Sequence, residues 1–133
     1  MIVDTSAIVA IMRNEPDAAR YVDALLDAPS VRISAGTYVE ASILIDAVRD
    51  PVLSSRFDDL VQQWGLRVEP FSASQAEIAR RAFGAYGRGS GHAARLNLGD
   101  CFAYALARES RTPLLYKGDD FAKTDLISAL PRR

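Results

Sequence analysis

The chain has 133 residues and a formal net charge of −1, and 49% of its residues are hydrophobic while 25% are charged. This size and composition predict one globular domain over residues 1–133, with enough apolar side chains for a substantial core. We expect neither a membrane span nor a secretory signal, since no apolar run approaches the roughly 20 residues that cross a bilayer. The single cysteine excludes an internal disulfide and favours the cytoplasm.

Short strands alternate with helices along the chain. In chain order we expect a strand at 1–3, helices at 5–12 and 16–28, a strand at 31–34, helices at 37–48 and 51–64, a strand at 66–70, helices at 73–86 and 98–109, a strand at 113–117 and a fifth strand at 126–130. The helix starts follow from capping signals: Asp50 before Pro51, Ser72 before Gln75, and Asn97. Residues 132–133 resemble a loose tail.

This alternation predicts an α/β fold. Parallel strands need crossover connections, and the helices that make these connections cover both faces of the sheet. We therefore expect a central parallel sheet of four to five strands with helices on both faces.

Acidic residues recur where strands end and helices begin. Asp4 ends the first strand, Glu40 lies early in the helix after the second strand, and Asp100 opens the last helix. Asp119 and Asp120 directly follow the fourth strand. In doubly wound sheets ligands bind beyond the carboxyl ends of the strands, where the strand order switches. One simple topology would therefore bring these acids together.

Each acid taken alone also fits a purely structural role. Asp4 could cap the helix that follows it, Thr37-x-x-Glu40 and Asn97-x-x-Asp100 resemble capping boxes, and Asp119 with Asp120 could form a turn. Together, clustered carboxylates repel one another by about 4 kcal/mol per pair at ~4 Å in an effective dielectric near 20. A divalent cation removes this cost. Oxygen ligands favour Mg²⁺ or Mn²⁺, whereas zinc would call for more than one histidine and one cysteine.

Positive charge is concentrated in one segment, residues 80–117. It contains seven basic and two acidic residues and carries +5, so the remainder of the chain carries −6. A basic stripe beside acidic metal ligands would suit a polyanionic substrate, although a solvated surface is an equal alternative. Within this segment Arg88, His92 and Arg95 flank a glycine-rich loop at 87–92 and are candidate phosphate contacts. Cys101 is expected to be a packed thiol.

Several motifs in this chain resemble those of PIN-domain proteins, in particular VapC-type toxins of bacterial toxin–antitoxin pairs. The opening Met1-Ile2-Val3-Asp4-Thr5-Ser6-Ala7 and the stretch Tyr38-Val39-Glu40-Ala41-Ser42 are similar to family motifs. More specific are Leu96-Asn97-Leu98-Gly99-Asp100-Cys101-Phe102-Ala103 and Leu114-Leu115-Tyr116-Lys117-Gly118-Asp119-Asp120-Phe121. The resemblance covers nearly the whole chain in the expected order.

The resemblance implies a divalent-metal-dependent endoribonuclease that cleaves cellular RNA. It also implies a homodimer and inhibition by a cognate VapB-type antitoxin. By position, Asp4, Glu40 and Asp100 match three family acids, with Asp4 and Asp100 as the metal ligands. Many PIN domains place the fourth acid where this chain has Gly118. The nearest candidates are the two residues that follow it, Asp119 and Asp120; we favour Asp119, with Asp120 shaping the loop. One or two metal ions are compatible with these residues.

Two other classes remain open from the sequence. A receiver-type signalling domain would share the size, topology, Mg²⁺ and a late-strand lysine, here Lys117, but a phosphoacceptor aspartate at the end of a middle strand is missing. A catalytically inactive PIN binding module is the second.

The apolar helix at 38–48 is expected to be mostly core, with an exposed remnant for a dimer partner or an antitoxin helix. Thr5 and Ser6 are expected to hydrogen-bond a ligand carboxylate or a phosphate.

Overall fold

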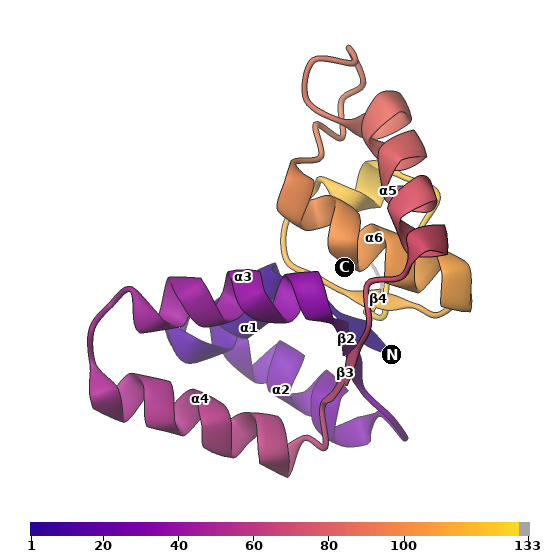
Figure 1. The fold of residues 1–133 in the computed structure, drawn as a ribbon. Coiled ribbons are helices and arrows are strands. Elements are labelled where there is room, and N and C mark those ends of the chain that lie inside the picture. Colours follow the sequence, from indigo (N-terminus) through magenta and orange to yellow (C-terminus); the bar gives the residue numbers. More distant parts are fainter. Residues whose placement is uncertain (131–133) are drawn as a thin grey trace.

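A four-stranded parallel sheet organises the computed structural model, which describes residues 1–130 (Figure 1). The expected tail at 132–133 lies outside the described residues. The strands lie in the order β3-β2-β1-β4 and comprise β1 (Ile2–Val3), β2 (Arg32–Ser34), β3 (Arg67–Glu69) and β4 (Leu114–Leu115). The chain moves from β1 through β2 to β3, then returns to place β4 on the free side of β1. The strand order therefore switches beside β1, at whose end Asp4 lies.

Six α-helices and one 3-10 turn connect the strands within the described residues. They are α1 (Thr5–Met12), α2 (Ala18–Asp27), α3 (Ala35–Asp46), α4 (Pro51–Gln63), α5 (Ala73–Tyr86), α6 (Leu98–Ser110) and the 3-10 turn η1 (Phe121–Lys123). The predicted caps of α4, α5 and α6 are confirmed, because Asp50, Ser72 and Asn97 each accept a hydrogen bond from a backbone amide of the first turn. None of these helices is both long and apolar enough to cross a membrane.

Apolar side chains pack on both faces of the sheet, as expected for an α/β fold. Neighbouring residues of a strand point to opposite faces, so Val3 and Leu115 join a core with α1, α2, α3 and α4. Ile2 and Leu114 join a second core with α5 and α6. Figure 1 shows α5 and α6 grouped on one side of the strands and α1, α2 and α4 on the other. Full burial of each such side chain contributes about 1.5–3 kcal/mol.

Three details differ from expectation. The fifth strand reduces to a single parallel bridge between Ser128 and Leu114, so the sheet has four strands in residues 1–130. Helix α3 begins two residues before the expected start. It is also less buried than expected, because the inner side of the helix uses only Thr37, Ala41 and Ile45. Other apolar side chains of α3 and the turn after it face solvent: Val39, Ile43, Leu44 and Val48.

Cys101 is buried, and burial raises the pKa of its thiol to about 11, which confirms a packed cysteine.

Candidate active site

Separate elements deliver the predicted acids to one edge of the sheet. Asp4 directly follows β1, Glu40 lies in the second turn of α3, and Asp100 lies in the first turn of α6. The negative charges of Asp100 and Glu40 both raise the pKa of Asp4, and Glu40 also raises that of Asp100. The structure thus brings these three carboxylates into one electrostatic cluster.

Asp4 is the most deeply buried member of the cluster. Its side chain is only 3% exposed, and its Oδ2 accepts hydrogen bonds from the Ser6 amide at 3.0 Å and the Ser6 hydroxyl at 2.6 Å. Its Oδ1 is buried and has no hydrogen-bond partner in residues 1–130. Burial, with a smaller contribution from the neighbouring acids, raises the pKa of Asp4 to about 7. The predicted cap is therefore real, but it occupies only one of the two carboxylate oxygens.

Glu40 is held by the residue that follows Asp4. The Thr5 hydroxyl donates to Glu40 Oε1 at 2.6 Å, so the turn from β1 into α1 positions two of the three acids. The capping-box alternative for Glu40 is wrong, because α3 begins at Ala35 and Thr37 lies inside the helix. The second Glu40 oxygen lies against Gly99, where a Cβ would fall 1.7 Å from Oε2. Only glycine at this position leaves room for the carboxylate.

Asp100 combines a capping role with membership of the cluster. Its Oδ2 accepts from the Asn97 amide at 2.9 Å, and its own amide donates to Asn97 Oδ1 at 2.8 Å, which completes the predicted capping box. Burial nevertheless raises the pKa of Asp100, the charges of Asp120 and Glu40 raise it further, and Arg88 lowers it. Each of the three acids therefore has one oxygen fixed by the protein.

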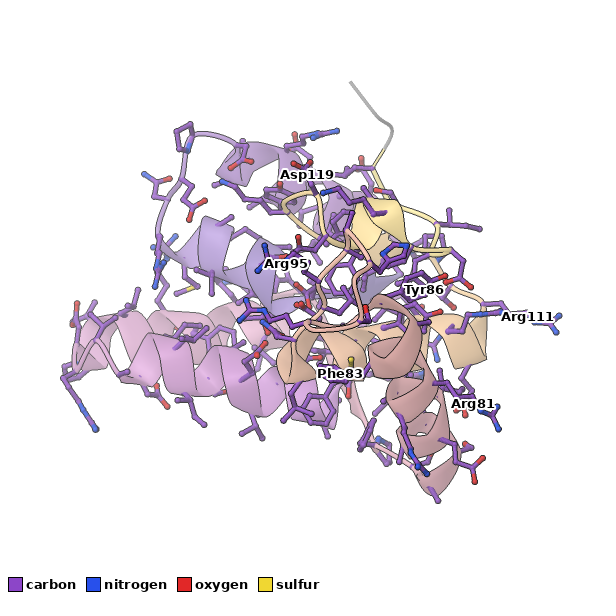
Figure 2. The ribbon with its side chains drawn as sticks, turned by 90° about the horizontal axis from the view of Figure 1, so that it is seen from above. Arg81, Phe83, Tyr86, Arg95, Arg111 and Asp119 are labelled. Carbon is purple, nitrogen blue, oxygen red and sulfur yellow. The ribbon has the colours of Figure 1, made fainter. Side chains whose placement is uncertain are left out.

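The fourth acid lies on the loop after β4. Asp119 and Asp120 are both exposed there, directly after Gly118, whose φ of +98° makes the turn. The charge of Asp120 acts on Asp100, so Asp120 faces the cluster. Figure 2 labels Asp119 on this loop, above Arg95 in that view.

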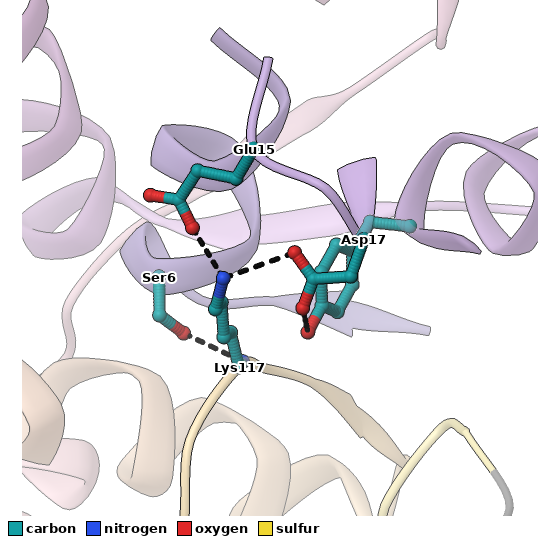
Figure 3. A network of polar contacts seen from close by, with 5 residues as sticks. Ser6, Glu15, Asp17 and Lys117 are labelled. Carbon is teal, nitrogen blue, oxygen red and sulfur yellow. Dashed lines mark hydrogen bonds and ion pairs between the residues drawn. The ribbon is translucent and has the colours of Figure 1, made fainter. Parts of the chain in front are cut away.

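Ser6 connects the cluster to the end of β4. Its hydroxyl donates to Asp4 Oδ2 and accepts from the Lys117 amide at 2.9 Å. The Lys117 ammonium is bound by Glu15 and by Asp17 Oδ1, the latter at 2.9 Å (Figure 3). These hydrogen bonds raise the pKa of Lys117. Thr5 and Ser6 thus position carboxylates as predicted. The side chain of Lys117 is bound by the loop between α1 and α2 and does not belong to a free basic surface.

The glycine-rich loop is closely hydrogen-bonded. The Arg88 amide donates to the Leu96 carbonyl at 3.0 Å, and the Leu96 amide donates to the Tyr86 carbonyl at 2.9 Å. His92 Nδ1 accepts from the Ala94 amide at 3.0 Å, and its ring packs edge-on against Tyr86 at 4.9 Å. His92 therefore organises the loop. Arg88 and Arg95 are exposed, and Arg88 lies close enough to Asp100 to lower its pKa.

The basic segment does not form one continuous stripe. Lys117 is paired with acids, and Arg108 forms an ion pair with Asp125 at 3.2 Å. Arg81 and Arg111 project from one side of the molecule, whereas Arg95 lies elsewhere (Figure 2). The basic stripe is therefore only partly present, since two of its seven residues are paired with acids and Arg95 lies apart from Arg81 and Arg111.

The acid cluster suits Mg²⁺ or Mn²⁺, which keep several bound waters, better than a metal ion that protein side chains surround completely. Among residues 1–130, no three histidine, cysteine, aspartate or glutamate side chains are grouped tightly enough to enclose an ion by themselves. Mg²⁺ keeps several waters and is usually held by one or two carboxylates together with substrate phosphates. The unpartnered Oδ1 of Asp4 is a buried oxygen of the kind such an ion binds.

Known proteins match the chain along nearly its whole length. The family model "PIN domain" matches residues 1–126 of the chain. Ribonuclease VapC28 of Mycobacterium tuberculosis is 53% identical over 133 residues, covering 100% of both chains. This match spans all the acidic motifs described above.

Solved structures share the same fold. The Mycobacterium tuberculosis toxin VapC20, described as cleaving the sarcin–ricin loop, matches with a TM-score of 0.76 and 18% identity, covering 98% of each chain. A toxin–antitoxin complex from Klebsiella pneumoniae matches with a TM-score of 0.72 and 18% identity, covering 97% of each chain.

Proposed function

The chain belongs to the PIN domain family, and from that premise we propose that it is the toxin of a type II toxin–antitoxin pair, an endoribonuclease that hydrolyses phosphodiester bonds in cellular RNA. In this proposal the whole chain acts as one PIN domain in the cytoplasm. The observation that carries it is the acid cluster. Asp4, Glu40 and Asp100 come from three elements, and each has one oxygen fixed by a hydrogen bond from the protein.

The proposed reaction depends on a divalent cation, Mg²⁺ or Mn²⁺. Asp4 and Asp100 would hold it. When bound, such an ion supplies a water of lowered pKa and stabilises negative charge at phosphorus. Glu40 is placed to orient that water or to accept its proton, since Thr5 fixes one carboxylate oxygen and Gly99 leaves space beside the other.

The fourth acid is assigned to the loop after β4. We retain Asp119 as a candidate, but the charge that Asp120 exerts on Asp100 favours Asp120 as the residue that faces the cluster. Arg88 and Arg95 are proposed to contact substrate phosphates beside Asp100. His92 supports them by ordering the loop, through its hydrogen bond from Ala94 and its contact with Tyr86.

An antitoxin and a second copy of the chain are the proposed protein partners. A groove of about 400 Å³ between α5 and α6 is lined mainly by apolar side chains, including Phe71, Phe83, Leu98 and Phe102. Its lining includes Leu98, which is 71% exposed and directly precedes Gly99, the glycine that lies against the Glu40 carboxylate. An antitoxin segment in this groove would reach the active site. The exposed face of α3, with Val39 and Ile43, is proposed as the surface that meets a second copy.

The alternatives are less well supported. Family membership overturns the receiver-domain alternative, and the lysine that suggested it, Lys117, is paired with Glu15 and Asp17. An inactive PIN module would not need three carboxylates oriented in this way.

The direct test is to map new RNA 5′ ends after a brief pulse of expression, with Asp4→Asn as the control. We expect cleavage sites with the wild-type chain and none with the variant. Purified wild type should cut the same RNA with Mg²⁺ and should stop when a chelator is added. If Asp4→Asn cut at the wild-type rate, the assignment of the site would be wrong.

A further inference from the structure

The side of the α5–α6 pair that faces away from the apolar groove carries a second, chemically different groove. It has a volume of about 500 Å³, and its lining includes Arg81, Tyr86, Tyr104, Arg108, Arg111 and Asp125. Figure 2 shows Arg81 and Arg111 projecting at this side, with Tyr86 closer to the centre of the view. A smaller cavity of about 220 Å³ shares Arg108, Arg111 and Asp125 and extends to the exposed Ile127.

The two carboxylates of this groove are already engaged by the protein. Asp125 accepts a hydrogen bond from the Tyr104 hydroxyl at 2.6 Å and forms an ion pair with Arg108 at 3.2 Å. Glu109 accepts from the Ser74 hydroxyl at 2.5 Å and from the Gln75 amide group at 3.2 Å. Arg108 offsets the charge of Asp125, whereas the two partners of Glu109 are neutral and only order its side chain.

Two guanidinium groups are left without an acidic partner. Arg81 and Arg111 are exposed, and neither forms an ion pair with any residue in 1–130. Arg111 ends α6 in a left-handed conformation, with φ of +51°. Few residues other than glycine adopt this backbone conformation, and it directs the Arg111 side chain away from the end of the helix. With three arginines and two carboxylates in its lining, the groove has a net positive charge, and the two unpaired arginines favour an anionic ligand.

We propose that this groove is a second binding site for the RNA substrate, which holds phosphates away from the point of cleavage. Arg81 and Arg111 contact the phosphates, and the half-buried Tyr86 offers a ring for an unpaired base. From the residue separation, Arg111 lies about 16 Å beyond Asp100 along the axis of α6. A strand that leaves the acid cluster past Arg88 reaches the groove along Tyr86, whose ring contacts both His92 and Tyr104.

The mixed lining favours RNA over an acidic peptide. An acidic peptide has no base to stack on Tyr86, whereas an unpaired nucleotide presents a base as well as a phosphate. Guanidinium groups beside aromatic rings suit phosphates next to bases. This inference rests on the proposed ribonuclease function, because it concerns a more distant part of the same substrate.

The test compares binding of two labelled single-stranded RNAs of mixed sequence, one of about 3 and one of about 30 nucleotides, because at about 3.4 Å per stacked nucleotide only the long RNA spans the distance from the acid cluster to the groove. Fluorescence anisotropy is measured over a salt series in the presence of a chelator, so that the RNA is not cut. The variant is Arg81→Ala with Arg111→Asn, since asparagine tolerates the left-handed backbone. The matched control is Arg56→Ala with Arg67→Ala, which removes the same charge from α4 and β3.

We expect the groove variant to bind the long RNA several-fold more weakly and to reduce the slope of log affinity against log salt by about 1.4, or about 0.7 for each lost phosphate contact. The short RNA and the control variant should be unaffected. With Mg²⁺, KM for the long RNA should rise while kcat stays unchanged. Thermal denaturation of both variants establishes that they are folded.

Equal affinity and salt slope in the groove variant and the control would overturn the inference while leaving the ribonuclease function intact. Unchanged RNA binding combined with lost binding of a poly-glutamate peptide would also overturn it and would assign the groove to an acidic protein. If the wild type neither bound nor cut RNA, the proposed ribonuclease function itself would fail. This outcome differs from a failure of the groove inference, because it is seen in the wild type before any variant is compared.

Discussion

Gly99 offers the sharpest test of the active-site geometry. A Cβ at this position would lie 1.7 Å from Glu40 Oε2, 2.5 Å from its Cδ and 2.9 Å from its Oε1. Ordinary contact begins near 3.4 Å, so Gly99→Ala must displace the Glu40 carboxylate by more than an ångström and strain its hydrogen bond from Thr5. A misplacement of about 1 Å can cost about 100-fold in rate, which corresponds to about 2.7 kcal/mol.

The same substitution should leave the protein folded and change its stability only moderately. Alanine is favoured over glycine within a helix by about 0.5–1 kcal/mol, and this gain offsets part of the weakened hydrogen bond, which is worth about 1.5–3 kcal/mol when one partner is charged. We therefore expect Gly99→Ala to fold normally, with a free energy of unfolding within about 2 kcal/mol of wild type, yet to cleave RNA about 100-fold more slowly.

The matched control is Gly84→Ala in α5, where a Cβ meets nothing within 4 Å. It should keep wild-type activity and gain a few tenths to about 1 kcal/mol of stability. Activity is measured as kcat/KM on one cleavable RNA, and stability by chemical denaturation. Wild-type cleavage by folded Gly99→Ala would refute the idea that the position of Glu40 matters to the reaction.

Three further outcomes follow from the same site. Because the pKa of Asp4 is about 7 in the folded protein against an ordinary value of 3.8, the folded state holds more protons between these values, so stability should fall as pH rises from about 4 to about 7. Denaturant titrations at several pH values should show this slope, and Asp4→Asn should flatten it; a wild-type slope in the variant would contradict the assignment. Mg²⁺ at 100 times its Kd should stabilise the wild type by about 2.7 kcal/mol in thermal denaturation, and it should leave Asp4→Asn unchanged. Asp120→Asn should reduce cleavage more than Asp119→Asn in parallel assays, since Asp120 is the residue whose charge reaches Asp100; the opposite order would restore Asp119 as the fourth acid.

The sequence alone was sufficient for the parts of this protein that depend on neighbouring residues. Caps such as Asp50 before Pro51 and Asn97 before Asp100 are formed within a single turn, so they were predicted correctly. The alternation of strands and helices likewise predicted the parallel sheet. The end of the first strand and the start of the last helix predicted the positions of Asp4 and Asp100.

Tertiary structure alone decided the features made by residues far apart in the chain. The space that Gly99 leaves for Glu40, the ion pairs of Lys117 with Glu15 and Asp17, and the outward apolar face of α3 have no local signature. A carboxylate at a helix start looks the same in sequence whether its second oxygen faces water or another acid. Which of these holds depends on how the helices pack against the sheet. That packing brought two capping aspartates and a glutamate from inside α3 into one charged cluster.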